Sequence, residues 1–214
     1  MKKVKEEIIV SIIISAYNSE KYIFETLESI KLQSYNNIEL VITDDCSNDN
    51  TISIIKKWID TNDSRFVATK LIRSKSNTGI APNINRGINA CKGEWISLVA
   101  GDDALYPDAV KNYIKHIQKN KNILFLHGQV STFKDKLTTN RLIKNTPTKE
   151  FRFNQDITAN EQFEIMLRIN PIIGGLFINK KIFARAGLFD EKFPFWEDKP
   201  FFLKVLRKNI KIYF

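Results

Sequence analysis

The sequence predicts an α/β protein with a doubly wound, mostly parallel central sheet flanked by helices. Short β-branched runs alternate with segments of helical periodicity through the first half of the chain, as parallel β-α-β units require. A polar cluster follows three of these apolar runs: "SAYNSE", "TDDCSND" and "AGDDA". Ligands of such sheets bind where the strands end, so we expect these clusters to share one edge of the sheet.

Four strands and four helices are expected in the first half. Glu7–Ser15 is rich in β-branched residues, which favour strands. Further strands are expected at Ile38–Thr43, at Arg65–Ile72 and in "EWISLVA". Helices are expected after Ser19, which would cap the first of them, over Thr51–Ile59 and Asn83–Cys91, and from Pro107 at an N1 position with Asp108 in the first turn.

The second half is less regular. Asn122–Val130 predicts a strand, whereas Lys134–Asn160 is polar and poorly patterned and is expected to be mostly loop. "GGLFINKKIFARAG" predicts a short strand and a helix that ends at Gly187, and another helix is expected after Asp198 with Pro200 in its first turn. The final "IKIYF" predicts an apolar strand, from which we expect a fragment of a longer protein.

The composition is that of a globular domain in a reducing compartment. The chain has 214 residues, 43% hydrophobic and 27% charged, enough for one domain with a real core. The apolar run Ile8–Ala16 is too short for a membrane span, which needs ~20 residues, and no signal-peptide cleavage pattern follows the basic Met1–Lys5. Cys46 and Cys91 lack CxxC spacing and are interpreted as free thiols. We therefore expect a cytoplasmic protein.

The formal net charge of +9 leaves several partners open. The lysines are scattered, so a solvated surface is the simplest interpretation. A phosphate-bearing ligand, or peripheral contact with the anionic inner face of a membrane, is the alternative. Nucleic acid is not expected as a partner, because no arginine–aromatic pattern of a binding surface is present.

Bound phosphates would require a cation rather than a glycine-rich loop. The segment "SAYNSEKY" after the first strand has no glycine, so neither a G-x-G-x-x-G turn nor a P-loop is present. Asp102 and Asp103, at the end of the fourth expected strand, offer the carboxylate oxygens that Mn²⁺ or Mg²⁺ prefers. The alternative is a turn with a helix cap, since Asp often caps helices.

Three ordered stretches resemble the family 2 inverting glycosyltransferases of the GT-A type. They are "VSIIISAYNSEKYIFETLESIKLQSYNNIELVITDDCSNDNT", "NTGIAPNINRGINACKGEWISLVAGDDALYPDAV" and "GGLFINKKIFARAGLFDEKFPFWEDKPFFLKVLRKN", and together they reach from about Val10 to Asn209. The resemblance implies a GT-A fold, which is Rossmann-like, with a small acceptor-side subdomain. It implies one catalytic domain, with a nucleotide-sugar-binding half over 1–106 and an acceptor-side half over 107–214.

The resemblance also implies a role for individual residues. The catalytic base would be Asp198, which follows Glu197 in "FWEDKP". An alternative for that acidic pair is a helix cap and first turn. The remaining roles implied are a cradle for the nucleotide base at Ser15, Ala16 and Tyr17, a base contact at Asp45, a closing loop at Asn77, the ribose or the metal at Asp102, and the metal at Asp103.

Two features depart from the family pattern or leave it open. Many members read Asp-x-Asp-Asp, and Ala100 replaces the first of these aspartates, although one branch of the family has a similar A-x-D-D arrangement. Many members also have Pro where Ala16 stands. Phe193, Phe195 and Trp196 before the acidic pair would either stack on a sugar or pack in the core.

The expected activity is transfer of a sugar from a nucleotide-diphospho-sugar, a UDP-sugar in the first place, to a glycan or lipid-linked sugar acceptor. Mn²⁺ or Mg²⁺ is the expected cofactor. Two alternatives stay open: a nucleotide-sugar-binding module that lost catalysis, which Ala100 favours, and a sugar-phosphate nucleotidyltransferase. The second would want a glycine-rich, arginine-containing loop after the first strand, which "SAYNSE" does not provide.

Overall fold

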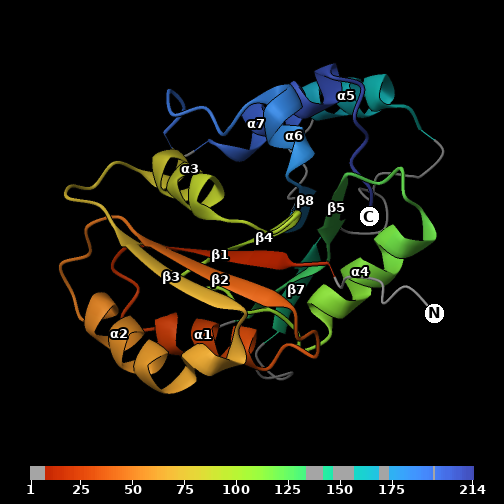
Figure 1. Ribbon diagram of the computed structural model, residues 1–214. Coiled ribbons are helices and arrows are strands. Elements are labelled where there is room, and N and C mark those ends of the chain that lie inside the picture. Colours follow the sequence, from red (N-terminus) through yellow and green to blue (C-terminus); the bar gives the residue numbers. More distant parts are fainter. Residues whose placement is uncertain (1–7, 134–141, 147–156, 169–173, 195) are drawn as a thin grey trace, which may run out of the picture.

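A six-stranded, mostly parallel sheet forms the centre of the protein (Figure 1). The computed structural model describes residues 8–133, 142–146, 157–168, 174–194 and 196–214. The strand order is β3-β2-β1-β4-β8-β5, and β6 and β7 form a separate two-stranded ribbon. The strands are β1 (Val10–Ala16), β2 (Ile38–Asp44), β3 (Ala68–Arg73), β4 (Trp95–Ala100), β5 (Phe125–Gly128), β6 (Val130–Phe133), β7 (Leu142–Thr146) and β8 (Gly174–Asn179).

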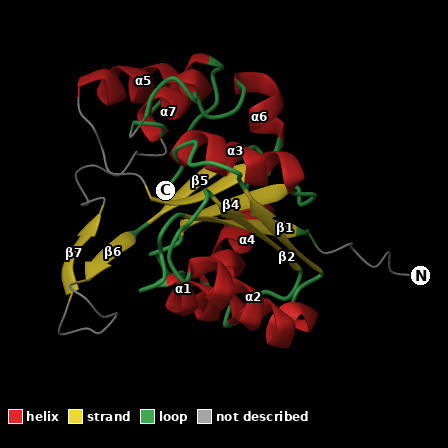
Figure 2. Cartoon of the chain, turned by 90° about the vertical axis from the view of Figure 1, so that its left-hand side faces the viewer, coloured by secondary structure: helices red, strands yellow, loops and turns green. Residues whose placement is uncertain are grey.

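Helices cover both faces of the sheet, as Figure 2 shows. Alternating residues of β1 divide the core in two, because successive strand side chains point to opposite faces. Ile12 and Ile14 pack with the buried side chains of α1, α2 and α4, whereas Ile13 belongs to the cluster that contains those of α3, α5, α6 and α7. The helices are α1 (Ile23–Lys31), α2 (Thr51–Asn62), α3 (Ile80–Ala90), α4 (Ala109–Lys119), α5 (Ala159–Arg168), α6 (Lys181–Ala186) and α7 (Asp198–Arg207), with a short 3₁₀ turn η1 (Asp63–Arg65).

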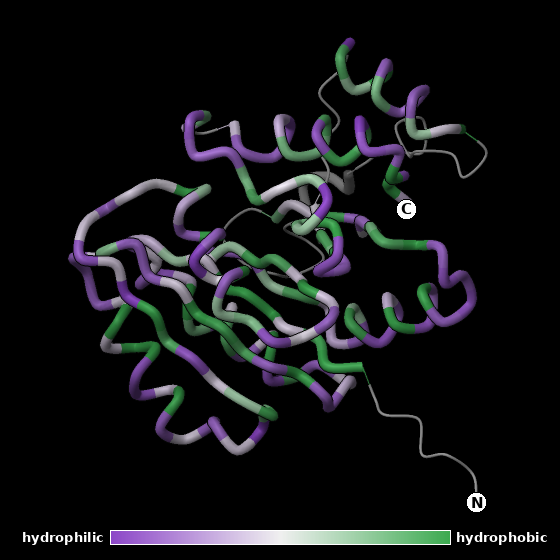
Figure 3. The backbone as a smooth tube through the Cα atoms, turned by 45° about the horizontal axis from the view of Figure 1, so that its top comes forward, coloured by the Kyte–Doolittle hydropathy of each residue, from purple (hydrophilic) through white to green (hydrophobic). Residues whose placement is uncertain are grey.

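The sheet changes direction at β8. Strands β3, β2, β1 and β4 are parallel, whereas β8 pairs antiparallel with β4 and with β5. The doubly wound, mostly parallel sheet expected from the sequence is therefore confirmed. Figure 3 shows that hydrophilic and hydrophobic residues alternate along the helices, as is expected for helices with one buried and one exposed face. None of the helices in the described part of the chain has the length and apolarity that crossing a bilayer takes.

Two expected helix starts are wrong. Tyr22 is the N-cap of α1, and Ser19 contributes only its carbonyl, since its hydroxyl donates back to the Tyr17 carbonyl (3.3 Å). Asp108 is the N-cap of α4, so Pro107 precedes that helix. The Pro107 carbonyl is held by a neighbouring loop, where it accepts a hydrogen bond from Ser34 N (2.8 Å).

The second half holds further differences. The strand expected at Asn122–Val130 is divided, because the register shifts near Gly128 and the chain passes from β8 as partner to β7. The final "IKIYF" is no strand but forms a single bridge between Tyr213 and Leu126. The expected helix end at Gly187 is confirmed, with φ of 80° in the left-handed region.

The expected loop Lys134–Asn160 falls largely outside the described residues, but its described parts include β7 and the start of α5. Helix α5 has a sequence signal that the periodicity reading missed. Thr158 and Glu161 form a capping box, in which Thr158 N donates to Glu161 Oε2 (2.6 Å) and Glu161 N donates to Thr158 Oγ1 (3.2 Å).

Candidate functional site

The carboxyl ends of β1, β2 and β4 meet at one edge of the sheet. In the parallel pairing Ala16 is level with Asp44, and Ser15 is level with Ala100. Gly101 N continues the ladder by donating to the Ser15 carbonyl (2.9 Å). The three polar clusters predicted to share an edge therefore do so.

Gly101 lets the loop after β4 approach the loop after β1. A Cβ at this position would lie 2.7 Å from Ser19 Oγ and 3.2 Å from Ala16 Cα, so any larger residue would force the loop after β1 to shift. The Gly101 carbonyl accepts a hydrogen bond from Thr26 Oγ1 (3.1 Å) at the start of α1. This contact fixes the chain just before Asp102.

The three residues expected to cradle a nucleotide base differ in what they expose. Ala16 is 1% exposed, and its carbonyl already accepts from Asp45 N (3.0 Å). Ser15 is half-buried, with its carbonyl bound to Gly101 N. Tyr17 is 46% exposed, so it is the member of this trio whose side chain is free to stack on a planar ring.

Hydrogen bonds join the loop after β1 to the loop after β2. Together they explain why a Ser, an Asp and a Thr recur at short spacing in "DDCSNDNT": each side chain accepts a backbone N–H of the neighbouring loop. The bonds run from Asn18 N to Ser47 Oγ (2.9 Å), from Ser19 N to Thr51 Oγ1 (2.7 Å) and from Glu20 N to Asp49 Oδ2 (3.0 Å).

Asp44, the first acid of that motif, has a structural role. It is fully buried, and it accepts hydrogen bonds from both the backbone N (3.0 Å) and the hydroxyl of Ser47. Arg73 Nε lies 3.4 Å from Asp44 Oδ2. A buried carboxylate needs such hydrogen-bond partners. Through these bonds Asp44 orders the loop after β2, and neither of its oxygens is exposed to solvent.

Asp45 is engaged in the same way, by the turn before α3. Its Oδ2 accepts from Thr78 N (2.8 Å) and Gly79 N (2.7 Å), while Oδ1 accepts from Thr78 Oγ1 (2.7 Å) and Arg86 Nη2 (2.5 Å). Burial raises the pKa of Asp45, but these hydrogen bonds together lower it more, so the net pKa is below its usual range. A nucleotide base could reach this carboxylate only if the Thr78–Gly79 turn or Arg86 moved.

Arg86 and Asn83 of α3 also belong to this edge, and sequence reasoning missed both. Asn83 Nδ2 donates to the carbonyls of Ala16 and Thr43 (3.3 Å each), which attaches α3 to the ends of β1 and β2. Both residues lie in the segment "NTGIAPNINRG", but the local pattern of this segment does not predict which residues of the strands they contact. Asn77, in the same segment, is exposed and accepts from Gly79 N (3.1 Å).

Asp102 and Asp103 form the open part of the edge. Both are exposed, and neither carboxylate accepts a hydrogen bond from a described group. The pKa of Asp103 is raised, first by the protein that crowds around it and then by the neighbouring charge of Asp102. Two adjacent carboxylates that no cationic side chain of the described residues pairs with make a site that favours a positively charged ligand.

The donor set fits a hard divalent cation. Mg²⁺ and Mn²⁺ often take one or two protein carboxylates and fill the other positions with water and substrate phosphates. Among the residues that the structure describes, no group of three or more acidic, His or Cys side chains is arranged to hold a metal by itself. Asp102 and Asp103 would therefore hold such an ion together with a diphosphate.

A second acidic pair opens α7. Glu197 is the N-cap and Asp198 the first helical residue, as expected from the sequence. Asp198 has an exposed surface, but many protein atoms surround its carboxyl group and partly desolvate it. This desolvation, together with the charge of Glu197, raises the pKa of Asp198 to about 6. One oxygen of Glu197, Oε2, is buried without a hydrogen-bond partner in the described structure. The pair thus provides a carboxylate that accepts a proton near neutral pH.

Aromatic side chains stand on the segment before this pair. Phe193 is 47% exposed and Trp196 is 64% exposed, so neither packs in the core. Phe195 lies outside the described residues. Exposed aromatic rings beside an acid pair suit contact with the apolar face of a sugar ring.

A sequence model described as "Glycosyl transferase family 2" matches residues 11–183. A glycosyltransferase of Haemophilus influenzae is 28% identical over 93% of this chain and 60% of its own length. A glycosyltransferase of Rickettsia typhi is 29% identical over 96% of this chain and 61% of its own length. The chain thus spans less than two thirds of these relatives.

Solved structures share the fold. TarS of S. aureus, residues 1–349, superposes with a TM-score of 0.72 at 24% identity, covering 95% of this chain and 56% of TarS. That protein has also been solved in complex with UDP and with UDP-GlcNAc. The mannosyltransferase PcManGT of Pyrobaculum calidifontis, in complex with GDP-Man and Mn²⁺, has a TM-score of 0.69 at 18% identity, over 95% of this chain and 53% of its own. These structures support the GT-A fold expected from the sequence.

Proposed function

Because the chain belongs to glycosyl transferase family 2, we propose that it moves a sugar from a nucleotide-diphospho-sugar to a hydroxyl group with inversion of the anomeric carbon. A UDP-sugar is the favoured donor, and a glycan or lipid-linked sugar in bacterial-type polysaccharide synthesis is the favoured acceptor. The complexes of TarS with UDP and UDP-GlcNAc support this choice of donor, although PcManGT, which shares the fold, is in complex with GDP-Man.

The observation that carries the proposal is the open carboxylate pair at the sheet edge. Asp102 and Asp103 follow β4, with both side chains exposed and without partners among the described residues. The neighbouring acids Asp44 and Asp45 are buried and fully hydrogen-bonded. Asp44 and Asp45 have a role in the fold, whereas Asp102 and Asp103 have both carboxylates available to bind a cationic ligand.

Asp198 is the proposed general base. As the acceptor oxygen forms its bond to the anomeric carbon, the bond from that carbon to the diphosphate oxygen breaks, and the hydroxyl proton passes to a carboxylate oxygen of Asp198. The nucleoside diphosphate leaves with the electron pair of the broken bond. A base whose pKa lies near 6 is mostly ionised at neutral pH, as this step requires.

Asp102 and Asp103 are the proposed ligands of Mn²⁺ or Mg²⁺. When bound, the ion would offset the negative charge that builds on the leaving diphosphate. Tyr17 is proposed to stack on the nucleotide base, Asn77 to close over it, and Asp102 to contact the ribose or the metal. Asp45 is proposed to act near the base by holding the Thr78–Gly79 turn, since its oxygens are occupied.

A donor screen tests the proposal. Release of the nucleoside diphosphate is followed for UDP-, GDP- and other nucleotide sugars, with Mn²⁺, with Mg²⁺ and with EDTA. Metal-dependent release that Asp198→Asn abolishes supports the proposal. Lack of release from every donor, with intact donor binding, would instead support the nucleotide-sugar-binding module, which Ala100 favours.

The proposed location is the cytoplasm, in peripheral contact with the inner face of the membrane. Cys46 and Cys91 are both free, as thiols are in a reducing compartment. Lys111, Lys115 and Lys119 are exposed at four-residue spacing along α4, where they form a basic stripe that suits an anionic surface. Sedimentation with anionic lipid vesicles, compared with neutral ones, tests the membrane contact.

A further inference from the structure

The segment Leu188–Glu191 is fastened to α3 by one buried amide. Asn85 Nδ2 donates to the Phe189 carbonyl (3.0 Å), and Phe189 N donates back to Asn85 Oδ1 (3.1 Å). Asn85 Nδ2 also donates to Glu191 Oε1 (2.9 Å). Asn85 is 4% exposed, so its two bonds with the Phe189 backbone form away from water. The bonds of Asn85 join residues that are 104 and 106 apart in the sequence.

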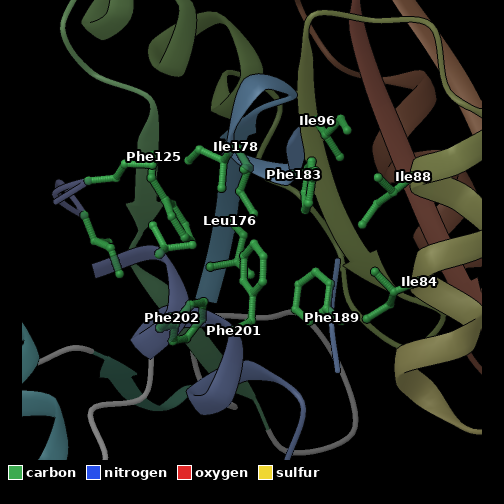
Figure 4. Close-up of a cluster of buried hydrophobic side chains, with 14 of the residues drawn as sticks. Ile84, Ile88, Ile96, Phe125, Leu176, Ile178, Phe183, Phe189, Phe201 and Phe202 are labelled. Carbon is green, nitrogen blue, oxygen red and sulfur yellow. The ribbon is translucent and has the colours of Figure 1, made fainter. Parts of the chain in front are cut away.

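The same segment is fastened to α7 on its other side. The rings of Phe189 and Phe201 stack with centroids 4.2 Å apart, and Lys204 Nζ donates to the Leu188 carbonyl (2.5 Å). Phe201 is fully buried and lies three residues after Asp198 on α7. Figure 4 shows Phe189 lying between Phe201 and Ile84 of α3.

Helix α3 in turn is fixed to the strand ends where the donor site lies. Asn83 donates to the Ala16 and Thr43 carbonyls, and Arg86 donates to Asp45. Asn85 lies between Asn83 and Arg86 in the sequence, but its side chain bonds to Phe189 and Glu191 instead of the strand ends. A chain of direct contacts runs from the donor edge through α3 and Phe189 to the helix that begins with Asp198.

We propose that Asn85 is a positioning residue that sets the place of Asp198 relative to the donor site. This inference rests on the proposed function, because it assigns Asp198 as the base. Asn85 holds the Phe189 backbone, Phe189 holds the first turn of α7 through Phe201, and that turn carries the Asp198 carboxylate. Misplacing a catalytic group by about 1 Å can cost on the order of 10²-fold in rate, so a remote amide is sufficient to control turnover.

The test compares Asn85→Ala with Asn179→Ala. Asn179 is an equally buried asparagine, 2% exposed, that also accepts from a backbone N–H, of Lys181 (3.0 Å), and donates to a carboxylate, of Glu94 (3.3 Å). It pairs with Trp95 at the amino end of β4, away from the site. Both variants lose similar bonds, but only Asn85→Ala cuts the path to Asp198.

Two measurements are made on each variant. Asn85→Ala should lower kcat by about 10- to 100-fold and leave the dissociation constant of the donor within about twofold, whereas Asn179→Ala should keep kcat near the wild-type value. Hydrogen exchange, which needs no activity, should accelerate at residues 188–191 and in the first turn of α7 in Asn85→Ala alone. Equal losses of kcat in both variants, or unchanged exchange at α7 in Asn85→Ala, would overturn the inference.

A second set of variants, at Asn85 and Glu191, tests the proposal if Asn85→Ala does not fold. Asn85→Asp keeps the acceptor for Phe189 N but places a carboxylate against Glu191. Adding Glu191→Gln removes the repulsion between the two carboxylates and supplies an amide that can donate to Asp at position 85, but the Phe189 carbonyl still lacks its donor. The double variant should therefore turn over faster, and exchange more slowly at α7, than Asn85→Asp alone, without reaching the wild-type values. No recovery, with Glu191→Gln alone behaving as wild type, would contradict the proposal. Full activity of Asp198→Asn would refute the assignment of Asp198 as the base, while the exchange measurement would still decide whether Asn85 holds α7.

Discussion

At the scale of single residues, the raised pKa of Asp198 should give turnover a dependence on pH. Asp198 must be ionised to accept a proton, and its pKa is raised to about 6 by burial and by Glu197. We therefore predict that kcat rises with pH through about 6 and then levels off, and that on the acid side kcat varies in inverse proportion to the proton concentration. Asp198→Asn should lower kcat by ~10²- to 10⁴-fold while donor affinity stays near wild type. Steady-state kinetics from pH 5 to 8 and calorimetric donor titration measure both.

Glu197 provides the matched partner for that experiment. Its charge is one cause of the raised pKa of Asp198, so Glu197→Gln should move the acid limb of the kcat profile to lower pH. The plateau should fall only mildly, because the base remains. If Glu197→Gln is inactive while Asp198→Asn turns over normally, the roles of the two acids are exchanged.

Asp103 is predicted to act through metal-dependent donor binding. Asp103→Ala removes one of two exposed carboxylates whose charges repel each other, and the fold does not use it. Calorimetric titration of UDP in the presence of Mn²⁺ should show binding to the wild-type protein that the variant loses, with an unchanged unfolding transition. Unchanged affinity in the variant would exclude the metal assignment.

At the scale of elements, the packing of α3 on the sheet depends on Gly87. A Cβ there would collide with Ile13 Cγ2 and would lie 3.3 Å from Thr43 Cγ2. Because Ile13 is β-branched and fully buried in β1, it has little room to yield. In an ordinary helix interior Ala would be favoured over Gly by about 1 kcal/mol.

We predict that Gly87→Ala destabilises the protein in spite of that preference. Overpacking of a core costs about 1–3 kcal/mol, so a net loss on the order of 1 kcal/mol should remain. Urea denaturation measures the free energy of unfolding. The control is Asn89→Ala, an exposed position on the same helix, which should change stability by less than about 0.5 kcal/mol. A Gly87→Ala protein more stable than wild type would show that α3 can lift from β1 at little cost.

The elements that could be predicted are those whose pattern is local. Strands β1, β2 and β4 are apolar runs, and Asp198 with Pro200 marks the start of α7. The division of β5 from β6 was not predictable, because it depends on which distant strand each pairs with. The start of helix α5 is marked in the sequence by the Thr158–Glu161 capping box.

The residues of the candidate site also fall into those that a short motif selects and those whose contacts depend on distant parts of the chain. Asp102, Asp103 and Asp198 could be selected from short motifs and family resemblance, and the structure leaves these acids exposed. The engagement of Asp45 depends on a turn 33 residues later and on Arg86 at 41 residues. Such pairings are decided by the packing of α3, which no local pattern reports.

At the scale of the whole molecule, a single buried carboxylate ties the sheet together at the edge opposite the site. Glu39 of β2 is 1% exposed and accepts hydrogen bonds from Ser11 Oγ (2.6 Å) on β1 and Lys70 Nζ (3.0 Å) on β3. It also accepts from the backbone N of Lys92 (2.6 Å) and Gly93 (3.3 Å), in the connection from α3 to β4. Four parts of the fold therefore meet at one side chain.

The charge of Glu39 should contribute to stability at neutral pH. Burial raises its pKa, but the hydrogen bonds from Ser11, Lys92, Lys70 and Gly93 together lower it more, so its net pKa lies below the ordinary 4.5. A carboxylate with a lowered folded-state pKa stabilises the protein above its unfolded-state pKa. That contribution is lost as the pH falls from about 4.5 through the folded-state pKa.

We predict that Glu39→Gln lowers the free energy of unfolding at pH 7 by about 1–3 kcal/mol, because Gln keeps one acceptor oxygen but removes the charge that Lys70 and the backbone amides bind. The difference between wild type and variant should shrink as urea denaturation is repeated from pH 7 down through 4.5, since protonation of Glu39 then removes the same charge from the wild type. Glu94→Gln, at an exposed carboxylate on the neighbouring segment, should change stability by less than about 0.5 kcal/mol at each pH. A difference between wild type and Glu39→Gln that stays constant down to pH 3 would mean that the shape of the side chain, and not its charge, holds these strands together.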